Sequence, residues 1–130
     1  MHCTQDHAEY INFDFQSSPG EKGLSILTSS SRNPVFSHSK DIRDDIMYVS
    51  QIKVLTRRLS EKYITLFAKD QIMLCEKYGY RGCHVLIDSS CAYAQEIGNA
   101  LVSEGFAKTP SLQHKNSDVY SYSIQRATIG

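Results

Sequence analysis

The stretch IMYVSQIKVLTRRLSEKYITLFAKDQIMLCEKYGYRGCHVLI, residues 46–87, decides the fold of this chain. Its opening mixes β-branched and aromatic side chains with polar ones and predicts a strand. From Ser60 onward, apolar residues recur at helical spacing as far as Tyr78, and Gly79 follows where a helix commonly ends. The short apolar run at residues 83–87 predicts a central strand that is covered on both faces. The stretch therefore predicts a strand–helix–strand unit.

The sequence continues with a second helix and another strand. Apolar residues between 93 and 101 have helical spacing, and Gly105 followed by Phe106 is typical of a glycine-terminated helix. A polar loop is expected at residues 109–118. Residues 119–124 then alternate as a half-exposed strand does.

The part that precedes residue 46 predicts less structure. Residues 10–15 and 24–28 have strand-like patterns around a segment rich in turn-forming residues, so they predict a hairpin. Residues 29–45 are polar and Ser-rich, and we expect them to form a long surface loop. Residues 1–9 are expected to be flexible. The whole chain, residues 1–130, is interpreted as a single domain.

Composition narrows the class of protein. The chain has 130 residues, 41% of them hydrophobic, and 14 basic side chains balance 14 acidic ones. This balance gives no support to nucleic-acid binding or to a polybasic membrane surface, because both rest on excess positive charge. There is no apolar stretch long enough to span a membrane and no charged-then-apolar leader, so a cytoplasmic location is expected.

Four cysteines, Cys3, Cys75, Cys83 and Cys91, raise the question of disulfides or a metal site. Their spacings differ from the close Cys pairs of zinc sites, and a cytoplasmic chain keeps its thiols reduced. We therefore expect free, mostly buried thiols and no metal.

The order of elements from residue 10 to residue 124 resembles the core of the GNAT acyltransferases, the acyl-CoA N-acyltransferases. The resemblance implies an α/β fold with a mixed central sheet of about six strands and two main helices. In that family, the strand that corresponds to residues 48–55 leads into a loop that binds the pyrophosphate of acyl-coenzyme A, and the next helix points its N-terminus at the phosphates. If acyl-coenzyme A is bound here, the resemblance implies contacts from Val54, Arg57, Arg58, Leu59, Ser60 and Lys62.

The sequence departs from the family pattern in three places. The pyrophosphate loop of the family contains glycines, whereas residues 56–63 contain none. Many members have an Asn near the start of the last helix and a Tyr four residues before the Gly-Phe pair, where this chain has Ala94 and Leu101. The N-terminal strand and two helices of the family have no room before Tyr10.

These departures leave the catalytic residues unassigned. Tyr93 is the nearest tyrosine to the family's acid position, but the helical pattern places it on the core face. A general base would come from Glu9, Asp44, Asp45 or a bound water, and the sequence does not select among them.

Two relatives of the fold also differ from the standard pattern. Ornithine decarboxylase antizymes resemble a GNAT core with two helices and no coenzyme site, and they act by binding a partner protein. Residues 84–87, 105–106 and 118–122, together with Pro110, resemble the C-terminal half of antizymes. Acyl-homoserine-lactone synthases also lack the glycine loop, and residues 50–54 resemble their central strand.

Two hypotheses follow for the function. The first is a non-catalytic, antizyme-like regulator without a cofactor, which binds a protein partner through an exposed aromatic patch that includes Tyr48, Tyr120 and Tyr122. The sequence leaves open whether the chain also associates with a second copy of itself. The alternative is an acyl-CoA-dependent N-acyltransferase with an atypical phosphate-binding loop.

Overall fold

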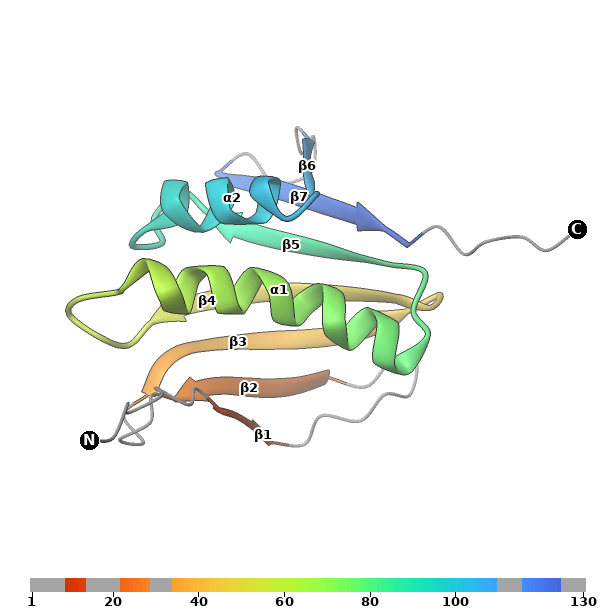
Figure 1. Ribbon diagram of the computed structural model, residues 1–130, viewed down its shortest axis with the longest axis horizontal. Coiled ribbons are helices and arrows are strands. Elements are labelled where there is room, and N and C mark those ends of the chain that lie inside the picture. The colour runs from red at the N-terminus through yellow and green to blue at the C-terminus, as the bar shows by residue number, and fades with distance from the viewer. Residues whose placement is uncertain (1–8, 14–21, 29–33, 110–115, 125–130) are drawn as a thin grey trace, which may run out of the picture.

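The structure is a computed structural model that describes residues 9–13, 22–28, 34–109 and 116–124. Both of its helices lie on the same face of a seven-stranded sheet with the order β1-β2-β3-β4-β5-β7-β6 (Figure 1). β4 and β5 are parallel, and the other neighbouring strands are antiparallel. The elements are β1 (Glu9–Phe13), β2 (Lys22–Thr28), β3 (Pro34–Arg43), β4 (Ile46–Val54), α1 (Glu61–Tyr78), β5 (Gly82–Asp88), α2 (Ala94–Ser103), β6 (Ala107–Thr109) and β7 (Ser117–Ser123).

The predicted strand–helix–strand unit is confirmed. α1 ends at Gly79, which adopts the left-handed conformation with φ 73°. The backbone N–H of Tyr80 then donates to the carbonyl of Cys75 at 2.9 Å, as in a glycine-terminated helix. β5 lies inside the sheet between β4 and β7. The expectation that both of its faces are covered is wrong, because Val85 on the helix-facing side is buried while its neighbours His84 and Leu86 on the other side are half-buried.

The second helix begins one residue later than the pattern suggested. Tyr93 is the N-cap of α2 and has φ 62°, so it belongs to the preceding turn. At the other end, the N–H of Phe106 donates to the carbonyl of Leu101 at 3.0 Å. The N–H of Gly105, with φ 108°, donates to the carbonyl of Val102 at 3.0 Å. This pair of bonds confirms the predicted Gly-Phe helix end.

The predicted hairpin of β1 and β2 is confirmed, whereas the predicted loop at residues 29–45 is wrong. Within it, β3 pairs with β2 on one side and β4 on the other. The helix-facing side of β3 is buried but is only half apolar, so it lacks the alternation by which strands are recognised. Its residues are Phe36, His38, Lys40 and Ile42. The short β6 was likewise not expected. The flexibility expected for residues 1–8 lies outside the described residues, and Glu9 belongs to β1.

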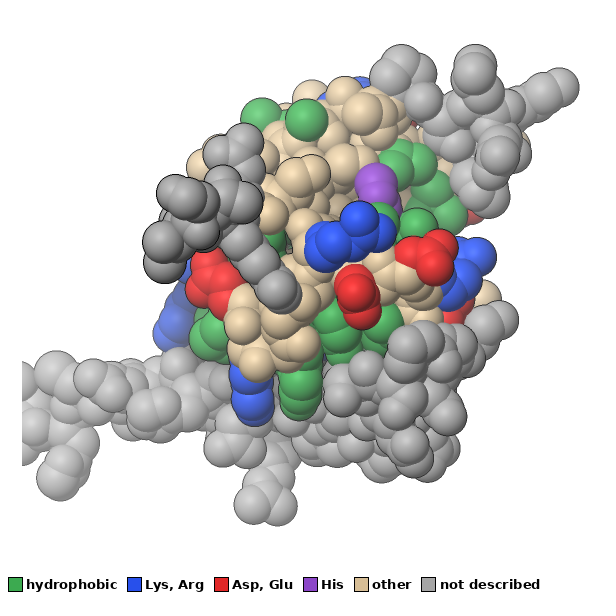
Figure 2. Space-filling view, turned by 90° about the vertical axis from the view of Figure 1, so that its right-hand side faces the viewer, with side chains coloured by type: hydrophobic (Ala, Val, Ile, Leu, Met, Phe, Trp, Pro, Cys, Tyr) green, Lys and Arg blue, Asp and Glu red, His purple; other side chains and the backbone are tan. Residues whose placement is uncertain are grey.

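A tight turn joins β3 to β4. Asp44 and Asp45 both have positive φ, 54° and 61°, as the mirror-image hairpin turns require. The Arg81 side chain donates to the backbone carbonyl of Asp44 at 2.8 Å. Acidic and basic side chains lie next to one another at this end of the molecule (Figure 2). It is the opposite end of the sheet from the start of α1 (Figure 1).

The hydrophobic core lies between the sheet and the two helices. It is built from side chains of β3, β4, β5 and β7 on one side and of α1 and α2 on the other. Phe67 of α1 packs against both Phe36 and His38 of β3, with ring centroids 5.5 and 5.2 Å apart. Neither helix of the described residues has the length and apolar character of a membrane span.

Candidate functional site

The two parallel strands pair along only part of their length. Their ladder runs from the pair Ile46 and Gly82 to the pair Val49 and Val85, although β4 and β5 both continue beyond it. Just past this point, Gln51 has φ 55°, and the pairing of β3 with β4 is irregular. A backbone bulge of this kind bends a strand and ends its regular pairing. The far ends of β4 and β5 are therefore not paired with each other, which leaves an opening in the hydrogen-bonded ladder between them.

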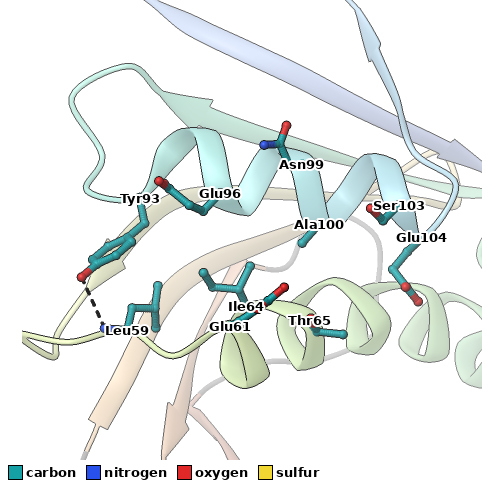
Figure 3. Close-up of a pocket in the computed structure, with 10 residues that line it drawn as sticks. All are labelled: Leu59, Glu61, Ile64, Thr65, Tyr93, Glu96, Asn99, Ala100, Ser103 and Glu104. Carbon is teal, nitrogen blue, oxygen red and sulfur yellow. Dashed lines mark hydrogen bonds between the residues drawn. The ribbon is translucent and has the colours of Figure 1, made fainter.

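Side chains from the turn that precedes α2 reach across this opening. The Sγ of Cys91 donates to the carbonyl of Ile52 in β4 at 3.5 Å. The hydroxyl of Tyr93 accepts a hydrogen bond of 3.5 Å from the N–H of Leu59, in the loop before α1. The left-handed backbone of Tyr93 turns its ring toward that loop (Figure 3). Tyr93 thus connects the two segments that border the opening.

A pocket of about 390 Å³ lies next to this contact, between the first turns of α1 and the length of α2 (Figure 3). Its apolar lining includes Leu59, Ile64 and Ala100, with the Tyr93 ring at one end. The polar lining residues are Glu61, Thr65, Glu96, Asn99, Ser103 and Glu104. The pocket is therefore apolar between the helices and carries three carboxylates.

The residues expected to contact a coenzyme lie in and around this region. Leu59 lines the pocket, and Val54 is partly buried against the core. The remaining four are exposed and do not line the pocket, namely Arg57, Arg58, Ser60 and Lys62. The predicted set thus extends from the end of β4, at Val54, through the loop to the first turn of α1. Glu96 of α2 and Glu104 at its C-terminal end were missed, because only the packing of the two helices brings them beside the start of α1.

The start of α1 has the features of an anion-binding helix terminus. Ser60 is the N-cap of α1, with extended φ and ψ of −82° and 149°. Its side chain makes no capping hydrogen bond, so the first N–H groups of α1 receive no acceptor from it. Exposed N–H groups at a helix start favour a bound anion. Glu61 in the first turn acts against a second negative charge there.

The three tyrosines predicted to form one partner-binding patch do not share a surface. Tyr120 is only 6% exposed, and its ring packs against Gly98 of α2. Tyr122 lies two residues on, so it faces the same helix, and its ring centroid is 5.2 Å from that of Phe106. Tyr48 lies on the opposite face of the sheet. The expectation of one exposed patch is therefore wrong, because Tyr120 and Tyr122 face the helices while Tyr48 points to the other side of the sheet.

The face of the sheet without helices carries an ordered polar row. The pairing of the strands places Asp41, Tyr48, His84 and Ser121 side by side. Tyr48 stacks on His84 with ring centroids 5.3 Å apart, and the Arg43 guanidinium lies 4.4 Å from the Tyr48 centroid. Nδ1 of His84 lies 2.7 Å from Oγ of Ser121. Partial burial lowers the pKa of His84. Without the strand register, the sequence could not show this row.

The candidate catalytic groups are not gathered in one place. Tyr93 borders the pocket, whereas Asp44 and Asp45 lie in the β3–β4 turn at the other end of β4 (Figure 1). A nine-residue strand separates that turn from the loop before α1, which is roughly 30 Å. The side chain of Glu9 is outside the described part of the chain. Neither aspartate is therefore placed to act at the pocket.

The cysteines are free thiols where the structure describes them. Cys75 and Cys83 are buried and Cys91 is half-buried, in agreement with the expectation. Cys3 lies outside the described residues.

Comparison with solved structures identifies the fold. A domain from Methanocaldococcus jannaschii matches with a TM-score of 0.64 and 12% identity over 91% of this chain and 100% of its own. A GNAT-family acetyltransferase from Staphylococcus aureus Mu50 matches with a TM-score of 0.59 and 13% identity, over 80% of this chain and 68% of its own. PaiA N-acetyltransferase from Thermoplasma acidophilum, solved in complex with coenzyme A, matches with a TM-score of 0.59 and 7% identity, over 78% of this chain and 60% of its own.

At the level of sequence, no family model and no curated protein matches the chain. Nothing in the comparisons supports the antizyme-like interpretation. The structural matches agree with the mixed sheet, the two helices and the parallel pair of strands described above. The chain has the fold of the GNAT acetyltransferases.

Proposed function

We propose that the protein is an acyl-CoA-dependent N-acyltransferase whose coenzyme binds at the opening between β4 and β5. The observation that carries this proposal is the early end of the β4–β5 ladder, directly beside an uncapped helix start and an apolar pocket. The opening, the anion-binding helix terminus and the pocket together offer complementary places for the parts of one long ligand with a charged end and an apolar arm.

The residues present fit the charged end of such a ligand at the loop and not inside the pocket. Arg57 and Arg58 are exposed immediately before α1, where their guanidinium groups can pair with phosphate. Inside the pocket, the carboxylates of Glu61, Glu96 and Glu104 would repel phosphate. The phosphates would therefore be held at the outer edge of the loop, which compensates for the missing glycines with charge.

The chain's own residues have separable roles in this proposal. Arg57, Arg58 and Lys62 would hold the pyrophosphate together with the first N–H groups of α1. Leu59 and Ile64 would contact the apolar arm of the coenzyme. The coenzyme, when bound, supplies an acyl group that is activated as a thioester. The bridge from Tyr93 to the N–H of Leu59 would have to open for ligand to enter the opening.

The test is isothermal titration with acetyl-coenzyme A and with a longer acyl-coenzyme A. The double variant Arg57→Ala/Arg58→Ala should raise the dissociation constant at least about tenfold, because charge-assisted hydrogen bonds contribute roughly 1.5–3 kcal/mol each. The matched control is Lys69→Ala/Lys77→Ala, which removes two exposed cations farther along α1 and should leave affinity unchanged. Equal affinities of the two double variants would contradict the assignment of the loop.

A non-catalytic role in binding a protein partner is the second candidate. It is favoured by the contacts of Cys91 and Tyr93, which close the opening, and by the three carboxylates that repel an anionic ligand. This role predicts no heat of binding with either acyl-coenzyme A. It also predicts that Tyr93→Phe, which removes the hydroxyl bridge, does not create binding.

A further inference from the structure

Two buried thiols that the proposed function does not use lie next to one another under the end of α1. Cys75 is in the last turns of α1 and Cys83 is in β5, and both side chains are fully buried. The Sγ of Cys75 donates to the carbonyl of Gly82, the residue before Cys83, at 3.5 Å. Cys83 follows Gly82 directly and lies on the buried, helix-facing side of β5, so the two thiols are neighbours. A dithiol therefore joins the helix to the sheet.

The surroundings shift the pKa values of the two thiols in opposite directions. Interaction with the Cys83 thiol lowers the pKa of Cys75, and the Lys40 ammonium lowers it further, against the effects of burial and of the Glu76 carboxylate. Burial, followed by interaction with the Cys75 thiol, raises the pKa of Cys83 well above its usual value. Cys75 therefore ionises more readily than Cys83, which is the order expected of an attacking and a resolving cysteine.

The ammonium group of Lys40 acts on both thiols and lowers the pKa of each. Lys40 is 1% exposed on β3, and burial lowers its pKa to about 8, opposed by attraction to Cys83, Asp70 and Cys75. A buried ammonium group is stable only beside negative charge. Cys83, the carboxylate of Asp70 and Cys75 are groups whose negative charge stabilises this ammonium.

We propose that Cys75 and Cys83 are a peroxide-oxidised dithiol that closes to an intramolecular disulfide. The Cys75 thiolate attacks one oxygen of hydrogen peroxide, the O–O bond breaks, and protonation of the leaving oxygen gives water and a sulfenic acid on Cys75. The Cys83 sulfur then attacks the Cys75 sulfur, the S–O bond breaks, and its hydroxyl leaves with the Cys83 proton as a second water. The sum is two thiols and one peroxide converted to one disulfide and two waters. Entry of the small oxidant requires local opening of the last turn of α1.

The folded Cys3→Ser/Cys91→Ser variant is treated with hydrogen peroxide. Its remaining thiols are then alkylated under denaturing, non-reducing conditions. We expect the mass to fall by two hydrogen atoms and proteolysis to release a joined peptide that contains Cys75 and Cys83. The peroxide dose is one that oxidises Cys91 in the unmodified chain. If Cys75 and Cys83 are then alkylated or over-oxidised independently of each other, the proposal is overturned. This outcome would leave the dithiol a packing feature only.

Single variants test the order of attack. With Cys83→Ser, Cys75 should accumulate as a sulfenic acid that dimedone captures, whereas with Cys75→Ser the capture at Cys83 should be at least about tenfold slower. Equal capture at the two positions would contradict the assigned roles. Serine replaces each thiol with a group of similar shape, and circular dichroism of the reduced variants checks that both are folded.

The role of Lys40 has its own readout. In Lys40→Met, the pH at which Cys75 becomes half-reactive should move upward by about one unit, which slows its oxidation about tenfold near neutral pH. Lys69→Met removes an exposed cation of α1 and should leave the profile in place. If Lys40→Met does not fold, the pH dependence of Cys75 reactivity in the unmodified chain tests the proposal instead. Reactivity of Cys75 that begins only above the ordinary thiol pKa would overturn the proposal.

Discussion

Gly98 shows at the scale of one residue how the packing of α2 on the sheet is set. A Cβ atom built on it would overlap the hydroxyl oxygen of Tyr120 and lie 2.6 Å from the ring carbon Cζ. Alanine is a better helix former than glycine by about 1 kcal/mol, so propensity alone favours replacement. The buried, rigid ring of Tyr120 cannot give way as a flexible side chain would. The close approach of α2 to β7 therefore requires glycine at this position.

We predict that Gly98→Ala lowers the free energy of unfolding by about 1–3 kcal/mol, because the added methyl group overpacks the core. Urea denaturation measures the change. Asn99→Ala, at the next and exposed position of the same helix, is the matched control and should be neutral or slightly stabilising. Tyr120→Phe should recover part of the loss in Gly98→Ala. A more stable Gly98→Ala protein would mean that helix propensity outweighs the contact.

The secondary-structure elements show which parts of the fold are predictable from sequence. Both helices were predicted because their signals are local: an apolar stripe and a glycine just past the end, at Gly79 and Gly105. β3 was not predicted, because its buried face carries His38 and Lys40 in place of two apolar residues. The loop of the candidate site was predicted, whereas Glu96 and Glu104 were not, since only helix packing places them at the pocket.

The turn between β3 and β4 was also missed, because Asp44-Asp45 is not one of the strong hairpin signals. Both residues have positive φ, a conformation that Asn and Gly adopt at lower cost than Asp. We predict that Asp44→Asn/Asp45→Gly raises the free energy of unfolding by about 0.5–1 kcal/mol. The backbone carbonyl that accepts from Arg81 is retained. Thermal unfolding of this variant beside Asp44→Ala/Asp45→Ala checks the prediction. A gain in both variants would point to relief of charge repulsion instead of backbone conformation.

At the scale of the whole molecule, the buried bases of β3 link stability to pH. Burial, with a smaller effect from Lys40, lowers the pKa of His38 well below its usual 6.5. Below about pH 6.5 the unfolded chain therefore binds a proton that the folded chain does not, and stability falls as the solution becomes more acidic. Burial lowers the pKa of Lys40 from 10.5 to about 8, so between these values the unfolded chain again holds the extra proton. Both groups make the folded state more stable at higher pH.

The thiol of Cys83 limits this increase. Burial raises its pKa well above 9.0, so above that pH the unfolded chain loses this proton first and stability decreases. We therefore predict that the free energy of unfolding, measured by urea denaturation, rises from pH 5 to pH 7 and again to a maximum near about pH 9. His38→Leu should remove most of the rise between pH 5 and pH 7 and leave the alkaline rise in place, because Lys40 remains. Lys40→Met should do the reverse. If His38→Leu retains the full acid loss, carboxylates elsewhere in the chain cause it, and the burial of His38 costs the folded state little.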